Sequence, residues 1–149
     1  MRTDFRLRPV GEADFEPLLD LSIRVLRADL ERVGRFDPDR RRTRMRAGFD
    51  PATLSAIEVD GRLVGCIGAV PAADHLEVHA FYLDPAVQGR GLGAAIVAAV
   101  LAAHPSLPAR IEVLKGSSVL AFWEKQGFRV IAEQPFDWFC ERPARRAGA

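Results

Sequence analysis

The alternation of apolar and polar residues divides the chain into short elements separated by glycine, proline and aspartate. Residues 5–10, FRLRPV, alternate in polarity and predict a short strand that Gly11 ends. Apolar residues then recur at helical spacing and predict an amphipathic helix over residues 14–33, before Gly34. A shorter helix is expected after Asp37, which can cap it, with Pro38 at its first position.

Strand signals dominate the middle and the end of the chain. Residues 54–70 hold two apolar runs around Asp60-Gly61, a dipeptide that favours a two-residue hairpin. Residues 76–83, LEVHAFYL, predict a further strand. A helix is then expected to about residue 103, a strand over 110–114, a helix over 117–126 that Gly127 ends, and a closing pair of strands, RVIAEQ and FDWFCE. This order predicts a mixed α/β layer and not a doubly wound sheet.

Size and composition favour one compact module. The 149 residues are 48% hydrophobic, which is enough for one core, so we expect a single domain over residues 1–142 and a disordered tail over 143–149. A net charge of +1 gives no field that would recruit nucleic acid or a membrane. The N-terminus shows no signal peptide, so a cytoplasmic location is expected. Cys66 and Cys140 lack metal-knuckle spacing and are interpreted as buried thiols; no metal site is predicted.

Three glycines in five positions, Gly89, Gly91 and Gly93, stand at the start of the predicted helix that ends near residue 103. The first N–H groups of a helix have no intrahelical acceptor, and the helix dipole favours an anion there. Glycines let the backbone come close to phosphate oxygens. A turn that merely permits tight packing is the alternative. Gly89, Gly91 and Ala94 also satisfy the dinucleotide pattern G-x-G-x-x-A, with Glu112 further on, but the preceding hairpin argues against that fold.

Two blocks of the sequence resemble the GNAT N-acetyltransferase superfamily. QGRGLG, residues 88–93, resembles the family's Q/R-x-x-G-x-G/A motif, and EVHAFYLDPAV before it looks like the family's fourth strand and loop. LKGSSVLAFWEKQGF, residues 114–128, is similar to the family's later strand and helix, which end in an aromatic residue, polar residues and Gly-Phe. The resemblance covers essentially the whole chain and implies a mixed, mostly antiparallel sheet of six to seven strands flanked by four helices.

The resemblance also implies an activity: transfer of an acetyl group from acetyl-CoA to a primary amine of a small molecule or peptide, by a monomer or homodimer. The pyrophosphate of acetyl-CoA would bind backbone N–H groups of the glycine-rich loop, and the pantetheine arm would run beside the end of the fourth strand. The implied cofactor-binding residues are Phe81, Tyr82, Leu83, Gln88, Gly89, Arg90, Gly91, Leu92, Gly93, Ser117 and Trp123.

Catalysis requires a neutral amine, a stabilised oxyanion and a leaving thiolate. Glu77 falls where the family carries a carboxylate base, and alternation puts His79 on the same strand face as second candidate. The oxyanion is expected to meet a backbone N–H at or beside Leu83. The family's usual tyrosine acid is replaced by Trp123, whose indole cannot supply a proton. Tyr82 would reach the face of Glu77 only through a bulge.

Between Arg24 and Arg46 there are nine arginines and four acidic residues. An acidic group on the acceptor is one interpretation of this excess; a solvated basic face, or contact with the 3′-phosphate of the cofactor, is the alternative. The arginines considered are Arg40, Arg41, Arg42, Arg44 and Arg46. Two alternatives to the enzyme remain open: a CoA-binding regulatory module without turnover, which the replacement by Trp123 favours, and a dinucleotide-binding domain.

Overall fold

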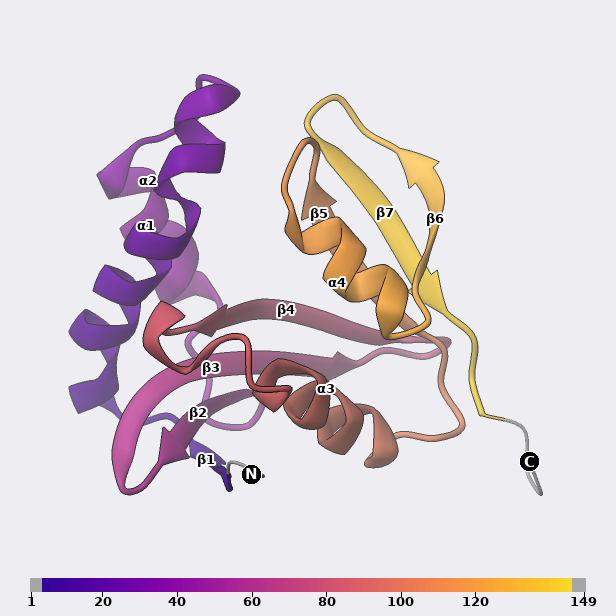
Figure 1. Cartoon of the computed structure of the whole chain (residues 1–149), viewed down its shortest axis with the longest axis horizontal. Helices are drawn as coiled ribbons and strands as arrows, with labels where there is room; N and C mark the ends of the chain where they lie inside the picture. The colour runs from indigo at the N-terminus through magenta and orange to yellow at the C-terminus, as the bar shows by residue number, and fades with distance from the viewer. Residues whose placement is uncertain (1–3, 146–149) are drawn as a thin grey trace. The chain divides into compact units, whose positions relative to one another are not determined.

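The computed structural model describes residues 4–145. Within them the chain forms seven strands, four α-helices and two short 3₁₀ helices (Figure 1). In chain order these are β1 (Arg6–Pro9), η1 (Glu12–Asp14), α1 (Phe15–Arg32), α2 (Pro38–Ala47), β2 (Leu54–Val59), β3 (Arg62–Pro71), β4 (Leu76–Leu83), η2 (Pro85–Val87), α3 (Leu92–Ala102), β5 (Ala109–Leu114), α4 (Val119–Lys125), β6 (Arg129–Glu133) and β7 (Asp137–Arg142).

The strands form a sheet in the order β1-β2-β3-β4-β5-β7-β6. Four neighbouring pairs are antiparallel, β1–β2, β2–β3, β5–β7 and β6–β7, whereas β4 and β5 are parallel. The described residues therefore confirm the predicted mixed, mostly antiparallel sheet with four helices. The tail predicted over 143–149 falls partly on residues 146–149, which lie outside the described residues.

Local signals in the sequence set several element boundaries. Asp60 (φ 52°) and Gly61 (φ 75°) both adopt left-handed backbone, as a tight hairpin turn between β2 and β3 requires. The carboxylate of Asp37 accepts hydrogen bonds from the N–H groups of Asp39 and Arg40 at 3.0 and 3.3 Å, so it caps α2 as predicted. Gly127, at φ 95°, follows the end of α4.

Contacts divide the chain into two compact units. The first comprises the residues up to Gly68 together with Ala80–Gly93, and the second comprises Ala69–His79 and the residues from Ala94 onward. Strand β4 therefore contributes residues to both units. The single domain expected over residues 1–142 stays a prediction.

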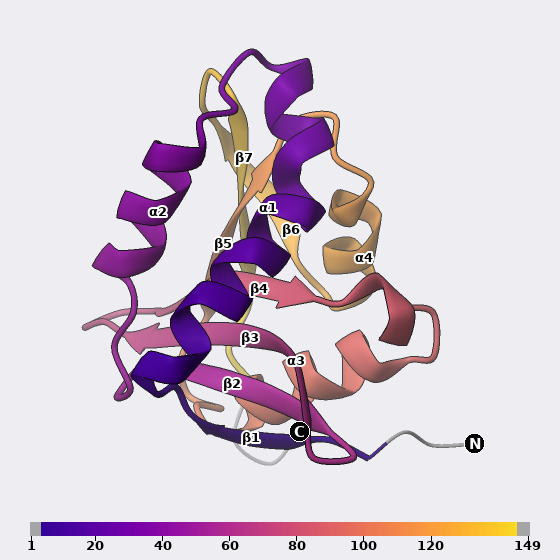
Figure 2. The same cartoon turned by 90° about the vertical axis from the view of Figure 1, so that its left-hand side faces the viewer.

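The first unit has its core where α1 packs on β2 and β3, and Figure 2 shows α1 crossing these strands. A second cluster joins α1 to α2 through Phe15, Leu19 and Met45. In both clusters the partly buried Tyr82 of β4 is a packing partner. The buried contacts of Tyr82 thus tie β4 to both N-terminal helices.

The second unit buries one face of β5. Ala109, Ile111 and Val113 are buried, and the residues between them are not. Ile111 pairs with Cys140 of β7, which is also buried. This alternation matches the period expected for a strand that covers a core on one side.

The N-terminal strand is held to the following turn by Asp14, a residue that the sequence pattern placed at the start of the first helix. Asp14 closes the 3₁₀ turn η1 and is the N-cap of α1, and its buried carboxylate accepts two hydrogen bonds from Arg8, at 2.7 and 2.9 Å. The N–H of Gly11 also donates to this carboxylate, at 2.8 Å. The hydrogen bonds from Arg8, ahead of that from Gly11, hold the pKa of Asp14 below its usual value despite burial.

Replacement of Asp14 by asparagine tests this anchor. A carboxylate whose pKa is lower in the folded than in the unfolded protein stabilises the fold when ionised, and this contribution is lost as the pH falls below about 4. We expect Asp14→Asn to lower the free energy of unfolding at pH 7 by about 2 kcal/mol. The difference from wild type should shrink toward pH 2 in urea denaturation. The exposed Asp20→Asn should behave like wild type, and a pH-independent deficit in Asp14→Asn would contradict the assignment.

Gly65 allows β3 to approach the end of β4 very closely. A Cβ at this position would lie 2.2 Å from the carbonyl oxygen of Tyr82 and 3.2 Å from the Cα of Leu83. Next to it, the N–H of Asp84 donates to the carbonyl of Val64 at 2.8 Å. Both neighbours of Gly65 are backbone atoms, which cannot move aside as the tip of a side chain can.

A single methyl group at Gly65 should therefore be costly. We expect Gly65→Ala to lower the free energy of unfolding by about 1–3 kcal/mol, as overpacking does. Gly11→Ala is the matched control, because a Cβ there would meet only an ordinary contact at 3.8 Å. Urea denaturation followed by circular dichroism measures both, and equal stability of the two variants would show that β3 and β4 separate at no cost.

Candidate functional site

The backbone of β4 is interrupted in its middle. Ala80 adopts left-handed backbone, with φ 51°, inside a strand whose other residues are extended. This conformation is rare for a residue with a Cβ and costs on the order of 1 kcal/mol. A left-handed residue within a strand is typical of a bulge, which breaks the alternation of side chains. Ala80 lies between Glu77 and Tyr82, where such a bulge would have to fall, and the approach of Tyr82 to the face of Glu77 stays a prediction.

The chain leaves β4 through a loop that is fixed by its own hydrogen bonds. The carboxylate of Asp84 accepts from the N–H of Ala86 at 3.0 Å and begins the 3₁₀ turn η2. The side-chain amide of Gln88 donates to the carbonyl of Leu83 at 2.7 Å. Gln88 thus ties the start of the glycine-rich loop to the last residue of β4.

The glycine-rich loop presents backbone N–H groups at the start of α3. Gly89 and Gly91 both have left-handed backbone, with φ 80° and 75°. A Cβ on either residue would meet no atom within 4 Å. Glycine is therefore required at these positions for the left-handed backbone and not for close packing. Their N–H groups find no acceptor within the described residues. Left-handed residues at alternate positions form nests of N–H groups that bind anions.

The two residues beside Gly91 have different environments. Leu92 is buried, with 2% of its surface exposed, and anchors the first turn of α3 in the core. Arg90 is exposed and supplies a cation on the loop. The loop therefore combines exposed donors with an apolar anchor, an arrangement suited to a phosphate group.

Tyr82 points toward the N-terminal helices. Its hydroxyl accepts a hydrogen bond from Nη2 of Arg41 at 3.1 Å, and the same nitrogen donates to Oγ of Ser22 at 3.4 Å. Burial, partly opposed by the charge of Arg41, raises the pKa of the Tyr82 phenol. The sequence did not predict this cluster, because an arginine in a basic helix has no signal that marks it as turned inward.

The carboxylate of Glu77 is in contact with a histidine of the loop before β4. Nε2 of His75 lies 3.2 Å from Oε2 of Glu77, and Nδ1 of His75 lies 2.8 Å from Oδ1 of Asp74. The side chain of Glu77 remains 38% exposed, so it is both held and accessible. The loop before β4 thus supplies an orienting partner for the predicted base.

His79, the second candidate base, is half-buried on the same strand. Burial lowers the pKa of its imidazole, and the nearby charge of Glu77 acts in the opposite direction. The net shift is downward, which favours the neutral form of the imidazole. A neutral imidazole can accept a proton.

The thiol of Cys66 lies behind the left-handed residue of β4. Sγ donates to the carbonyl of Ala80 at 3.1 Å, and the side chain is fully buried. Burial is the main cause that raises the pKa of this thiol to about 12. The interpretation of both cysteines as buried thiols is confirmed.

Residues 21–128 match the acetyltransferase (GNAT) family. The chain belongs to this family. No curated protein matches the sequence.

Solved structures of GNAT proteins share the fold at low identity. The PaiA N-acetyltransferase of Thermoplasma acidophilum, in complex with coenzyme A, is 18% identical over 94% of this chain and 99% of that one, with a TM-score of 0.72. Ard1 of Thermoplasma volcanium is 18% identical over 95% and 99%, with a TM-score of 0.74. N-acetylglutamate synthase of Neisseria gonorrhoeae, complexed with coenzyme A and N-acetyl-glutamate, is 17% identical over 98% of this chain and 36% of that one, with a TM-score of 0.71.

The aromatic residue before the Gly-Phe pair of this GNAT chain is part of the core. Trp123 is 4% exposed and makes a T-shaped contact with the ring of Phe128 at a centroid distance of 5.2 Å. Left-handed backbone at Gly127 accompanies the chain reversal that brings Phe128 back to Trp123. Ser117 accepts a hydrogen bond from the N–H of Val119 at 3.3 Å, at the start of α4. The cofactor contacts expected of Trp123 and Ser117 stay predictions.

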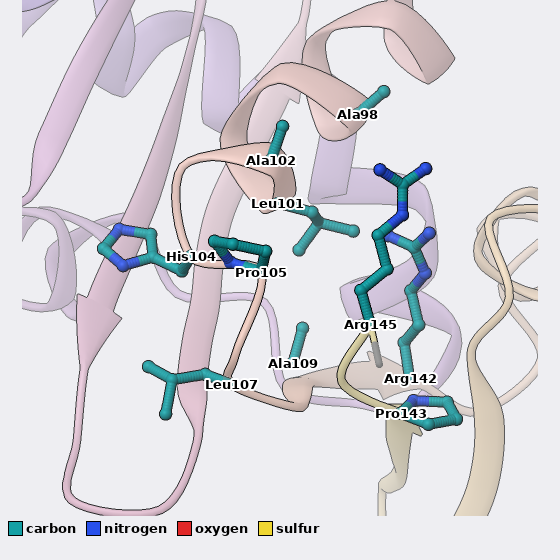
Figure 3. A pocket seen from close by; sticks show the side chains of 10 residues that line it. All are labelled: Ala98, Leu101, Ala102, His104, Pro105, Leu107, Ala109, Arg142, Pro143 and Arg145. Carbon is teal, nitrogen blue, oxygen red and sulfur yellow. The ribbon is translucent and has the colours of Figure 1, made fainter. Parts of the chain in front are cut away.

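A pocket of about 130 Å³ lies in the second unit of this GNAT chain (Figure 3). It is lined by the end of α3, the connection to β5 and the segment that follows β7, including Leu101, Pro105 and Ala109. In Figure 3 the side chains of Arg142 and Arg145 extend alongside each other at one wall. None of the predicted site residues lines it.

In the described part of the chain, no helix has the length and apolar character needed to cross a bilayer.

Proposed function

We propose that this protein is an N-acetyltransferase that transfers the acetyl group of acetyl-CoA to a primary amine of a small molecule or peptide, by direct attack in a ternary complex. The observation that carries this proposal is the loop of residues 88–93, whose left-handed Gly89 and Gly91 carry N–H groups with no acceptor within the described residues at the start of α3. Membership of the GNAT family supports the same activity. Coenzyme A in the PaiA and N-acetylglutamate synthase structures supports the choice of donor.

In this proposal the loop binds the pyrophosphate of the donor through its N–H groups, with Arg90 as the nearby cation. The main chain of Phe81 and Leu83 holds the pantetheine arm, and a backbone N–H at or beside Leu83 stabilises the oxyanion. The hydrogen bond from Gln88 to the carbonyl of Leu83 supports this assignment, because it fixes the loop relative to the end of β4.

Glu77 acts as the base, with His79 as the second candidate. The amine nitrogen attacks the thioester carbonyl carbon, the C–S bond breaks, and the electron pair leaves on sulfur as a thiolate. The proton that the amine must lose goes to the carboxylate of Glu77, directly or through water, and the thiolate takes its proton from solvent. The accessibility of Glu77 and its contact with His75 support the role.

The leaving group requires no acid from Trp123. A thiol has an ordinary pKa near 8.5, so it departs readily as a thiolate at neutral pH. The burial of Trp123 against Phe128 nevertheless favours a second candidate function, a CoA-binding module without turnover. We place either form of the protein in the cytoplasm, as a monomer or homodimer, with no nucleic acid or membrane as partner.

Titration calorimetry with acetyl-CoA, desulfo-CoA and NAD separates the candidates. We expect acetyl-CoA to bind with a Kd on the order of micromolar, and thiol release to follow when an amine is added. Binding of NAD without binding of CoA would contradict the assignment of the loop. Binding of acetyl-CoA without thiol release from any amine would leave the binding module as the function.

A substitution in the loop tests the donor site directly. Gly91→Glu places a side chain and a negative charge among the N–H groups, so we expect it to abolish binding of acetyl-CoA in calorimetry. Gly34→Glu is the matched control, because Gly34 also has left-handed backbone, with φ 72°, and no atom within 4 Å of a Cβ. The control has the same backbone strain and the same charge. If both variants fold and bind acetyl-CoA equally well, the loop does not hold the donor.

A second substitution tests the base. Glu77→Gln should lower kcat/KM by about 100-fold near pH 7, and by less above about pH 9, where more of the amine is already neutral. Glu124→Gln, an exposed change on α4, should match wild type at every pH. The pH profile of acetyl-CoA turnover measures both. A loss of the same size at all pH values would assign Glu77 to positioning of the substrate.

A further inference from the structure

The arginines of α2 are not equivalent, although the sequence gives no reason to separate them. Arg42 forms an ion pair with Glu16 of α1, and Arg46 forms one with Glu12 at 2.8 Å. Arg40 and Arg44 are exposed. Arg41 alone in this group is partly buried and directs its guanidinium at β4. Of the five residues, it is the one placed to act inside the protein.

The partners of Arg41 are neutral. Its Nη2 donates to the hydroxyls of Tyr82 and Ser22, and its guanidinium carbon lies 5.7 Å from the centroid of the Tyr82 ring. Its Nε is buried and has no hydrogen-bond partner within the described residues. No carboxylate in that part of the chain forms an ion pair with it. A guanidinium carries five N–H donors, so most of its donor capacity is unused.

Within the described residues, neither the charge nor all the N–H donors of Arg41 have a partner. The guanidinium is partly buried and has no counter-ion among the described residues, and its buried Nε is a donor without an acceptor, which is unfavourable. The neighbouring Arg44 adds positive charge, since it too acts on the phenol of Tyr82. The missing partner is therefore an anion, and a planar guanidinium suits the two oxygens of a carboxylate or phosphate.

The position of Arg41 indicates which molecule brings that anion. Its partner Tyr82 lies between Phe81 and Leu83, the residues whose main chain is proposed to hold the donor. An oxyanion bound at Arg41 would therefore belong to a molecule held beside the donor on the side of α1 and α2.

We propose that Arg41 binds a carboxylate or phosphate of the acceptor, so that the substrate is an amine that also carries an oxyanion. This inference rests on the proposed function, because it names the class of acceptor for that reaction. Tyr82 and Ser22 hold the guanidinium in place, and the anion takes the donors that they leave unused. Arg41 determines specificity for the acceptor and takes no part in the transfer of the acetyl group itself.

Matched pairs of amines test the proposal by thiol release. The pairs are 4-aminobutyrate with butylamine, phosphoethanolamine with ethanolamine, and amino acids with their amides. We expect wild type to prefer the anionic member of at least one pair by about 100-fold in kcat/KM, the range of a charged bidentate contact. The pair that shows the preference identifies the oxyanion as carboxylate or phosphate.

Variants of Arg41 separate recognition from structure. Arg41→Gln should reduce the preference to less than about 5-fold while leaving the KM for acetyl-CoA unchanged, and Arg41→Lys should keep part of it. Arg40→Gln, one residue away and exposed, should behave as wild type. Because the guanidinium lacks a counter-ion, Arg41→Gln should also have an unchanged or higher Tm.

The remaining outcomes overturn the proposal in distinguishable ways. Equal turnover of the anionic and neutral amines would refute the role of Arg41 and leave the acetyltransferase in place. A raised KM for acetyl-CoA in Arg41→Gln, with acceptor preference unchanged, would assign Arg41 to a phosphate of the donor. A lower Tm with the preference intact would show a structural role. Binding of acetyl-CoA with no turnover of any amine would overturn both proposals.

Discussion

The close approach of β3 to the end of β4 is the constraint on which the rest of the first unit depends. Gly65 has no side chain, so the carbonyl of Tyr82 can occupy the space where a Cβ would stand. This contact fixes the backbone of β4 just before the loop that leads to α3. It also positions the side chain of Tyr82 against α1 and α2, where the hydroxyl accepts a hydrogen bond from Arg41. The glycine-rich loop and the helices α1 and α2 thus both connect to the same short segment at the end of β4.

Sequence predicted those features of the fold that depend on local chemistry. The hairpin at Asp60-Gly61 and the cap at Asp37 need only neighbours in the chain, and both were correct. The first helix begins within one residue of its predicted start at Asp14, but the contact of this carboxylate with Arg8 on the preceding strand was not predicted. A contact between residues that only folding brings together does not appear in the hydrophobic periodicity of the sequence.

The same distinction explains what the sequence showed of the candidate site. The loop at Gly89 and Gly91 was predictable because left-handed backbone selects glycine, and both residues adopt it. Ala80 adopts that backbone without the glycine signal, so the interruption of β4 appeared in the sequence only as a condition for Tyr82. The contact of His75 with Glu77 and the inward turn of Arg41 depend on side-chain packing, which residue identity alone does not specify.

The buried thiol of Cys66 can serve as a natural probe of the separation of β3 from β4. Because the thiol is buried against the carbonyl of Ala80 and its pKa is raised to about 12, an alkylating reagent cannot react with it in the closed state. Its modification rate therefore reports how often β3 and β4 separate. Such kinetics measure this separation without any engineered probe.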